Sequence, residues 1–161
     1  MLTVTVDTNI LPIEDLVAAI APGEFAFAMT SVTHREIEGS VNLTPGAETS
    51  RVPETLVWGE SCWDGGFWGA ESDTACLERA LAIIADGSFP PPNRRATLNH
   101  GERSQLRDAM ILCAHVREKR DIFVTDDRRA FVRNDRRVKL EQLFSTRIMT
   151  QPEFLAKFSR K

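Results

Sequence analysis

Acidic residues follow two short apolar stretches that lie far apart in the sequence. Asp7 comes after LTVTV, and Asp126 and Asp127 come after IFVT. Alternating or continuous β-branched and apolar residues are typical of strands, whereas aspartate and asparagine favour turns and caps. In an open parallel sheet, functional side chains gather beyond the carboxyl ends of the strands. The sequence therefore predicts that carboxylates from two strand ends share one cleft.

Two more acids belong to the same prediction. Glu36 follows a second predicted strand, residues 25–29, by about one helical turn, with Glu38 as the alternate inward acid, and Asp108 lies in a long late helix beside its apolar run. Two like charges about 4 Å apart repel by roughly 4 kcal/mol at an effective dielectric near 20. Such a cluster must become protonated, pair with arginine or bind a cation.

Oxygen ligands without cysteine or histidine match Mg²⁺ or Mn²⁺. A cation of this kind polarises a phosphoryl oxygen and lowers the pKa of coordinated water, so hydrolysis of a phosphodiester is the matching reaction. The alternative interpretation is that each acid caps a turn or a helix, as aspartates after strands commonly do.

The elements that would position these acids alternate between strands and helices. We predict strands over residues 2–6, 25–29 and 121–127 and in the segment RIMT. We predict helices from Pro12 to Ile20, from Thr30–Ser31 to Gly39, from Ser72 or Asp73 to Gly87, over residues 102–120 and in the segment QPEFLAKF. Residues 89–101 are predicted to be irregular. This order predicts an α/β fold with a central parallel sheet flanked by helices on both faces.

The stretch from about 40 to 71 interrupts this alternation. It is rich in Gly, Pro, Ser and Thr and carries all three tryptophans, so we predict an inserted loop or hairpin. Its aromatic residues are expected to pin the insertion to the domain as a small core of their own, with stacking on unpaired bases or a partner surface as the alternatives. These residues are Trp58, Trp63, Phe67 and Trp68.

Length and composition favour one domain over residues 1–161, without a membrane partner, because no apolar run of about 18 residues occurs. The start lacks a basic stretch followed by an apolar one, so we expect a cytoplasmic protein. The spacing of the three cysteines and three histidines does not match a zinc site. Cys113 is predicted to be a core thiol and His115 a helix-surface histidine.

Charge is distributed unevenly along the chain. Residues 1–93 contain 3 Lys and Arg against 14 Asp and Glu, whereas residues 94–139 contain 13 against 7. This asymmetry suits an acidic centre that holds cations beside a basic surface that meets a polyanion. Solvated helix faces would give the same counts.

Four segments resemble, in order, the acidic motifs of PIN domains: VDTNIL, SVTHREIEG, LRDAMILCAH and IFVTDDRRAF, with RIMTQPEFL closing the chain. The resemblance covers nearly the whole chain apart from residues 40–71. It implies a Rossmann-like three-layer fold in which catalytic carboxylates bind metal, and polar neighbours orient them. The implied catalytic and metal-binding residues are Asp7, Glu36, Asp108 and Asp127, and the supporting residues are Thr8, Asn9 and Thr125.

Two features depart from this pattern or leave it open. The family's spacing of threonine, any residue and aspartate selects Asp127, but Asp126 remains a metal-ligand candidate, either through water or as a cap of the next turn. The segment DRRAF has one extra residue before its phenylalanine, and the Trp-rich insertion has no counterpart that we can assign.

The resemblance implies an Mg²⁺- or Mn²⁺-dependent endoribonuclease that acts on single-stranded RNA and leaves a 5′-phosphate. Arg128 and Arg129 are the first candidates for contacts with the RNA backbone, because planar guanidinium groups suit phosphate oxygens. Arg103, Arg107 and Arg133 are further candidates. Small members of the family act as toxins with an antitoxin or in RNA processing, and they often form homodimers, so the sequence leaves the protein partner open.

Two other functions compete with this interpretation. A phosphotransfer domain on a similar sheet would need a second aspartate where Asn9 stands, or a lysine after the late strand, where arginines follow instead. A catalytically inactive PIN-like module that binds RNA or protein would retain the fold. The complete set of four acids argues against this second alternative.

Overall fold

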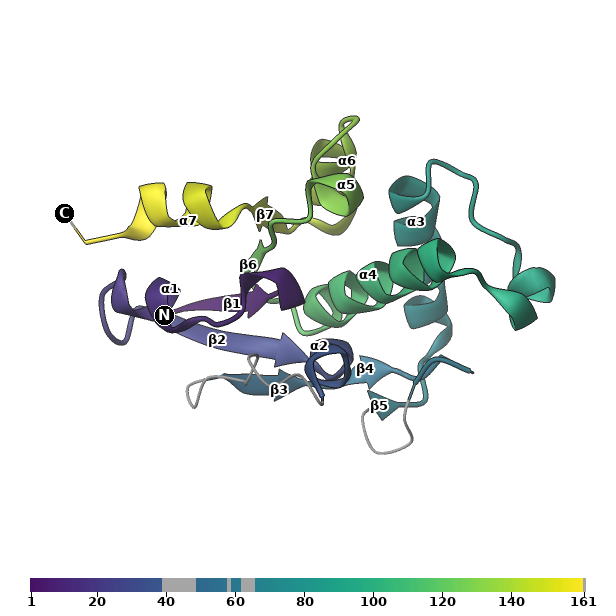
Figure 1. Cartoon of the computed structure of the whole chain (residues 1–161), viewed down its shortest axis with the longest axis horizontal. Helices are drawn as coiled ribbons and strands as arrows, with labels where there is room; N and C mark the ends of the chain where they lie inside the picture. Colours follow the sequence, from purple (N-terminus) through teal and green to yellow (C-terminus); the bar gives the residue numbers. More distant parts are fainter. Residues whose placement is uncertain (39–48, 58, 62–65, 161) are drawn as a thin grey trace.

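The computed structural model describes residues 1–38, 49–57, 59–61 and 66–160, and its centre is a five-stranded sheet (Figure 1). The strand order is β3-β2-β1-β6-β7, and every neighbouring pair is parallel. All carboxyl ends therefore lie at the same edge of the sheet. The strands are β1 (Leu2–Val6), β2 (Phe25–Thr30), β3 (Ser50–Val52), β6 (Ile122–Val124) and β7 (Arg147–Met149).

Helices connect these strands, as the sequence predicts for an α/β fold. Several begin at side chains that accept a backbone N–H: Thr30 accepts from Thr33 at 3.2 Å, and Asn99 accepts from Glu102 at 2.9 Å. The helices are η1 (Thr8–Ile10), α1 (Glu14–Ala18), α2 (Ser31–Ile37), α3 (Glu71–Ile84), η2 (Pro92–Thr97), α4 (His100–Arg117), α5 (Arg128–Phe131), α6 (Arg136–Phe144) and α7 (Gln151–Phe158).

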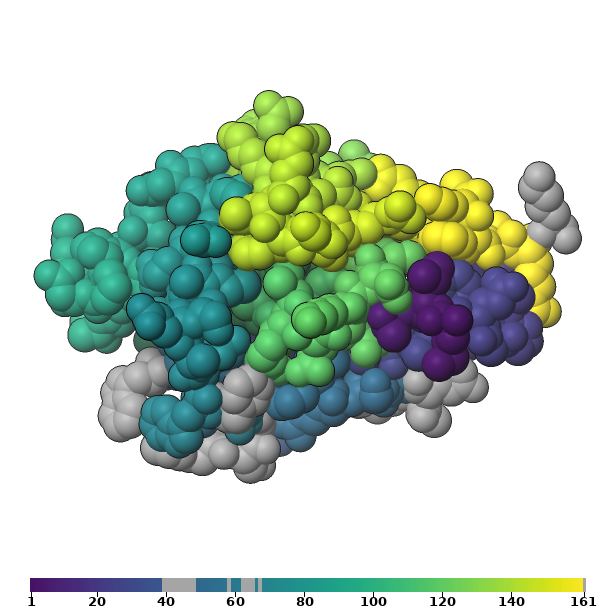
Figure 2. All heavy atoms as spheres, turned by 180° about the vertical axis from the view of Figure 1, so that it is seen from behind, coloured from purple at the N-terminus to yellow at the C-terminus, as the bar shows by residue number. Residues whose placement is uncertain are grey.

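Strand β6 shows how both faces of the sheet are covered. Ile122 and Val124 pack into a core with residues of α1 and α7, whereas Phe123 packs into a core with residues of α3, α4 and α6. Successive side chains of a strand point to opposite faces, so β6 is buried on both sides. Helices α3 and α6 contact each other, and Figure 2 shows them side by side on the surface of the molecule. The arrangement is consistent with three layers.

The region from 40 to 71 differs from the predicted inserted loop or hairpin. Residues 50–52 form β3, which belongs to the main sheet and pairs in parallel with β2. Strands β4 (Glu54–Thr55) and β5 (Gly66–Phe67) form a separate sheet and also pair in parallel, whereas a hairpin would be antiparallel. Strands of three and two residues are too short to show a period in the sequence. Residues 39–48, 58 and 62–65 lie outside the described residues.

The predicted aromatic core of this region is therefore not tested. Trp58 and Trp63 lie outside the described residues, as does the side chain of Phe67. Trp68 is 71% exposed, so its ring does not serve as a buried anchor.

The small β4–β5 sheet is attached to two helices by arginines. Arg35 of α2 forms an ion pair with Glu54, which is fully buried. Arg117 of α4 donates hydrogen bonds to Thr55 Oγ1 at 3.2 Å and to the Pro53 carbonyl oxygen. Burial raises the pKa of Glu54, and the Arg35 guanidinium opposes this change. The attachment of the β4–β5 sheet to α2 therefore depends on an ion pair inside the fold.

Several local predictions were wrong. Helix α3 begins after Ala70, not at Ser72 or Asp73, and Asp73 instead accepts the Ala70 N–H from within the first turn at 2.8 Å. The first helix begins at Glu14, after Pro12. Residues 92–97 form η2 within the segment predicted to be irregular, and α5 and α6 lie where no helix was predicted. Gly87, with a positive φ of 75°, follows α3 as predicted.

His115 is fully buried, so its prediction as a surface residue was wrong. Its ring bridges Thr5 Oγ1, 2.9 Å from Nδ1, and Thr146 Oγ1, 2.6 Å from Nε2. These hydroxyls satisfy a buried imidazole, and burial lowers its pKa to about 3. Cys113 is a core thiol as predicted, and its sulfur lies 2.6 Å from that of Cys76. Across the described residues, no helix is both long and apolar enough to cross a membrane.

Candidate acidic active site

Asp7 stands directly after β1 and is only 4% exposed. Its Oδ1 accepts the Thr8 backbone N–H at 2.7 Å, and its Oδ2 accepts Thr125 Oγ1 at 2.7 Å and Asn9 Nδ2 at 2.8 Å. Burial raises the pKa of Asp7 to about 6, although the hydrogen bonds from Thr125 and Thr8 lower it. The carboxylate is therefore fixed in position, and its charge is poorly compensated.

Thr125, at the end of β6, joins this carboxylate to Asp127. Its hydroxyl donates to Asp7 and accepts the Asp127 backbone N–H at 3.0 Å. Asp127 in turn begins α5, where its Oδ1 accepts the Ala130 N–H at 2.8 Å. Because β1 and β6 are neighbours in the sheet, one buried hydroxyl holds the acids of two strand ends together. The expected convergence of these strand ends is confirmed.

Asp126 has other partners. Its backbone N–H donates to Asn9 Oδ1 at 2.8 Å, and its Oδ1 accepts the Gln151 N–H at the start of α7 at 2.9 Å. By contrast, the charge of Asp127 raises the pKa of both Asp7 and Asp108. The structure thus groups Asp127 with the other acids and gives Asp126 a capping contact.

Glu36 reaches the same network from α2. It is exposed, and its Oε2 accepts the hydroxyl of Thr8, the residue after Asp7. The charge of Glu36 also contributes to the raised pKa values of Asp7 and Asp108. Glu38 lies just beyond the end of α2 and lines a surface pocket that also includes Glu36, Glu60 and Arg107. The electrostatic link to Asp7 therefore comes from Glu36.

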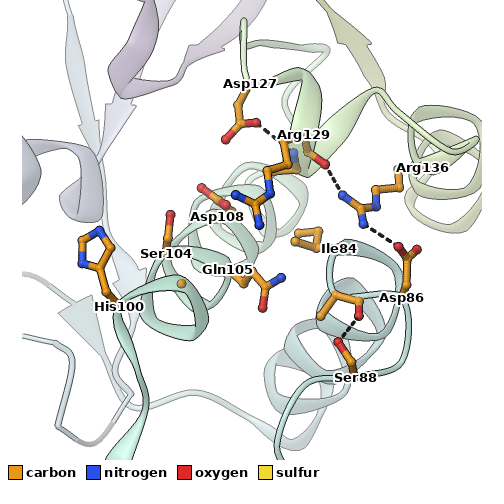
Figure 3. A pocket seen from close by; sticks show the side chains of 13 residues that line it. Ile84, Asp86, Ser88, His100, Ser104, Gln105, Asp108, Asp127, Arg129 and Arg136 are labelled. Atoms are coloured by element: carbon orange, nitrogen blue, oxygen red, sulfur yellow. Dashed lines mark hydrogen bonds and ion pairs between the residues drawn. The ribbon is translucent and has the colours of Figure 1, made fainter.

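Asp108 projects from α4 into a pocket of 470 Å³ that Asp127 also lines (Figure 3). In the part of the chain that the structure describes, its carboxylate has no hydrogen bond and no ion pair. Burial, followed by the charges of Asp7, Asp127 and Glu36, raises the pKa of Asp108 to about 9. Without a nearby cation, this carboxyl group is therefore protonated at neutral pH.

The acids influence one another's ionisation, but they are not packed as a preformed cage. Among the described residues, no three His, Cys, Asp or Glu side chains form a group that could hold a metal ion. Mg²⁺ commonly uses only one or two carboxylates and keeps several waters, so it does not need such a cage. The oxygen-only donors and the uncompensated carboxyls Asp7 and Asp108 fit Mg²⁺ or Mn²⁺.

The candidate arginines fall into two groups. Arg128 and Arg129 of α5 and Arg133 are exposed, and over the described residues their guanidinium groups have no hydrogen bond or ion pair. Arg103 and Arg107 both pair with Glu60, the former at 3.1 Å. Only the first group is available to a ligand without breaking an existing contact.

Three polar residues of α4 that line the Asp108 pocket escaped the sequence analysis: His100, Ser104 and Gln105. Ser104 precedes Asp108 by four positions and Gln105 by three, so both lie on the same helix face as Asp108. That spacing was visible in the sequence and would have identified them.

No protein-family model matches this chain, and no curated protein matches it.

Proposed function

We propose that this protein is a divalent-metal-dependent endoribonuclease of the PIN-like type, which hydrolyses phosphodiesters of single-stranded RNA. The observation that carries the proposal is the state of Asp108. Its carboxyl lies beside acids from two strand ends, lacks a partner among the described residues, and has a pKa raised to about 9. A bound cation would remove this penalty, because it favours the ionised form.

The surrounding residues prepare the site for this role. Thr125 and Asn9 hold Asp7, and the cap at Ala130 holds Asp127, so these carboxylates need little rearrangement to bind a ligand. When bound, Mg²⁺ or Mn²⁺ would polarise a phosphoryl oxygen and lower the pKa of water. Arg128 and Arg129, whose guanidinium groups have no partner among the described residues, would hold neighbouring phosphates.

The test is cleavage of a labelled, unstructured RNA in Mg²⁺, Mn²⁺ or EDTA. We expect metal-dependent cutting that falls by about 10²-fold or more in Asp7→Asn, Asp108→Asn and Asp127→Asn, as for loss of a group that stabilises transition-state charge. Asp126→Asn is the matched control and should keep most activity, because Asp126 contacts Gln151. Equal activity in all four variants would exclude the acidic site as the source of cutting.

A second candidate is a catalytically inactive module that binds RNA or protein. The absence of a preformed metal-binding group among the described residues favours it. Titration with Mn²⁺ at pH 7 separates the two candidates, because a cation that binds only the folded state raises the midpoint of thermal unfolding. The nuclease proposal expects a rise in wild type and little or none in Asp108→Asn. No rise in wild type at millimolar Mn²⁺ would favour the inactive module.

A further inference from the structure

The pocket beside Asp108 extends well past the acids. It lies between the end of α3 at Ile84 and Ala85, the first turns of α4, and α5 at Arg129 (Figure 3). Its volume of 470 Å³ falls within the range of pockets that hold small ligands, about 300–1,000 Å³. Asp108 and Asp127 form only one part of its wall, so most of the space is available to a group adjoining the acidic site.

Several polar side chains of this pocket lack a partner within the described part of the chain. For the residues that the structure describes, the side chains of His100, Ser104, Gln105 and Arg129 make no hydrogen bond or ion pair. In Figure 3, Arg129 extends from α5 toward α4, which carries Ser104 and Gln105. These donors and acceptors are therefore free to bind a polar ligand.

The polar groups on the opposite side of the pocket mostly bond within the fold. Arg136 pairs with Asp86 at 2.6 Å and donates to the Arg129 carbonyl, and Ser88 donates to the Ala85 carbonyl at 2.5 Å. These contacts connect α6, α3 and α5 into a fixed wall. Arg136 Nε is buried and has no hydrogen bond among the described residues, so a ligand would meet most of its polar partners on α4 and at Arg129 and this one donor on the wall.

The chemistry of the free groups matches a nucleotide. A guanidinium group suits phosphate oxygens, a glutamine amide offers a donor and an acceptor to a base edge, and a hydroxyl can contact the ribose 2′-OH. In the absence of a cation Asp108 is protonated and the charge of Asp127 repels phosphate, so a phosphate is drawn to the Arg129 side of the pocket. Ile84 also lines the pocket, but it is only 1% exposed and offers a base little apolar surface.

We propose that this pocket binds one nucleotide of single-stranded RNA immediately beside the cleaved bond, and that Gln105 distinguishes its base. The proposal rests on the proposed nuclease function for the position of the cleaved bond. Arg129 holds the phosphate of this nucleotide, Ser104 lies near its ribose, and Gln105 contacts the base edge.

Binding of labelled RNA homopolymers of A, C, G and U, measured in EDTA by fluorescence anisotropy, tests the pocket without cleavage. We expect wild type to prefer one base. Gln105→Ala should weaken binding to the preferred homopolymer by about 5-fold to 100-fold, the range for a base-edge contact, and should flatten the preference. Gln142→Ala, an exposed glutamine on α6, is the matched control and should change affinity less than about twofold.

The outcomes separate this proposal from the nuclease proposal. Unchanged affinity and unchanged base preference in a folded Gln105→Ala variant would overturn the nucleotide pocket, even if wild type cuts RNA in Mn²⁺. A wild type that binds with a base preference dependent on Gln105 but never cuts RNA would support the pocket and overturn the nuclease. A wild type that binds none of the homopolymers would overturn the pocket. Thermal unfolding of each variant confirms that it is folded.

Discussion

Asp108 couples the stability of the fold to pH. Its pKa is about 9 in the folded protein and 3.8 in the unfolded chain, so the folded state binds the proton more tightly. Its contribution to stability is present in full below about pH 4 and is lost as the pH rises toward 9. Asp7 acts in the same direction over a narrower interval, because its folded pKa is about 6.

We therefore predict that, in EDTA, Asp108→Asn removes much of this loss. At pH 8 the variant should exceed wild type in the free energy of unfolding by several kcal/mol, because ionisation of Asp108 in the unfolded chain favours unfolding of wild type alone, by about 1.4 kcal/mol for each pH unit above the unfolded pKa. At pH 4 the two should be nearly equal. Urea denaturation across this pH range measures the effect. Parallel pH profiles for the two proteins would contradict the proposed protonation of Asp108.

Thr125 allows a second prediction for a single side chain. Its hydroxyl is buried and joins Asp7 to the Asp127 backbone, so Thr125→Val removes one hydrogen bond from Asp7, which keeps those from Thr8 and Asn9, and leaves the Asp127 N–H without its partner. The variant should lose about 1–3 kcal/mol of unfolding free energy at neutral pH. Thr125→Ser retains the hydroxyl and should recover most of that loss. Equal stability of the Val and Ser variants in urea would show that the hydroxyl has no structural role.

At the scale of elements, the β4–β5 sheet depends on the pair of Arg35 and Glu54. Arg35→Ala removes the ion-pair partner of the buried Glu54 carboxylate and leaves only the more weakly acting charge of Arg51, and we predict a loss of about 3–5 kcal/mol in unfolding free energy. Arg79→Ala, on the exposed side of α3, is the matched control and should change stability by less than about 0.5 kcal/mol. If chemical denaturation gave similar values for the two variants, the ion pair would not anchor the small sheet.

The helices and strands that were predictable from the sequence have a recognisable pattern of apolar and capping residues within their own segments. Residues 2–6 alternate, Phe25–Thr30 ends at a capping threonine, and the long helix α4 has a clear apolar face. Strands β3, β4 and β5 have two or three residues each, so neighbouring strands and not local pattern decide their structure. Helix α5 has four residues and helix α6 follows two residues with positive φ, Asn134 and Asp135, which local helical patterns do not anticipate.

The candidate site was predictable where strand ends determine it, and not where contacts between distant segments do. The ends of β1 and β6 identify Asp7 and the pair of Asp126 and Asp127, because parallel neighbours end at the same edge. The sequence could not separate Asp126 from Asp127, since the contact of Asp126 with Gln151 joins segments 25 positions apart. Three-dimensional packing of β6 against β7 brings these segments together.

For the whole molecule, the uneven charge of the chain predicts a salt-dependent affinity for RNA. Each phosphate contact with single-stranded nucleic acid contributes about 0.7 to the slope of log affinity against log salt concentration. Arg128→Ala/Arg129→Ala should therefore reduce this slope by about 1.4 if each side chain contacts one phosphate. The control Arg79→Ala/Arg94→Ala removes two other exposed arginines and should leave the slope nearly unchanged. Identical slopes for both variants would identify Arg128 and Arg129 as solvated surface.

Both edge strands of the main sheet are short. Both β3 and β7 have three residues, Pro53 follows β3, and β7 begins at the exposed Arg147. A short edge presents few unpaired backbone groups, and proline or a charge beside it opposes docking of another strand. Joining copies of the chain edge to edge would thus gain little, so the sheet offers a poor template for fibrous aggregation even in concentrated solution.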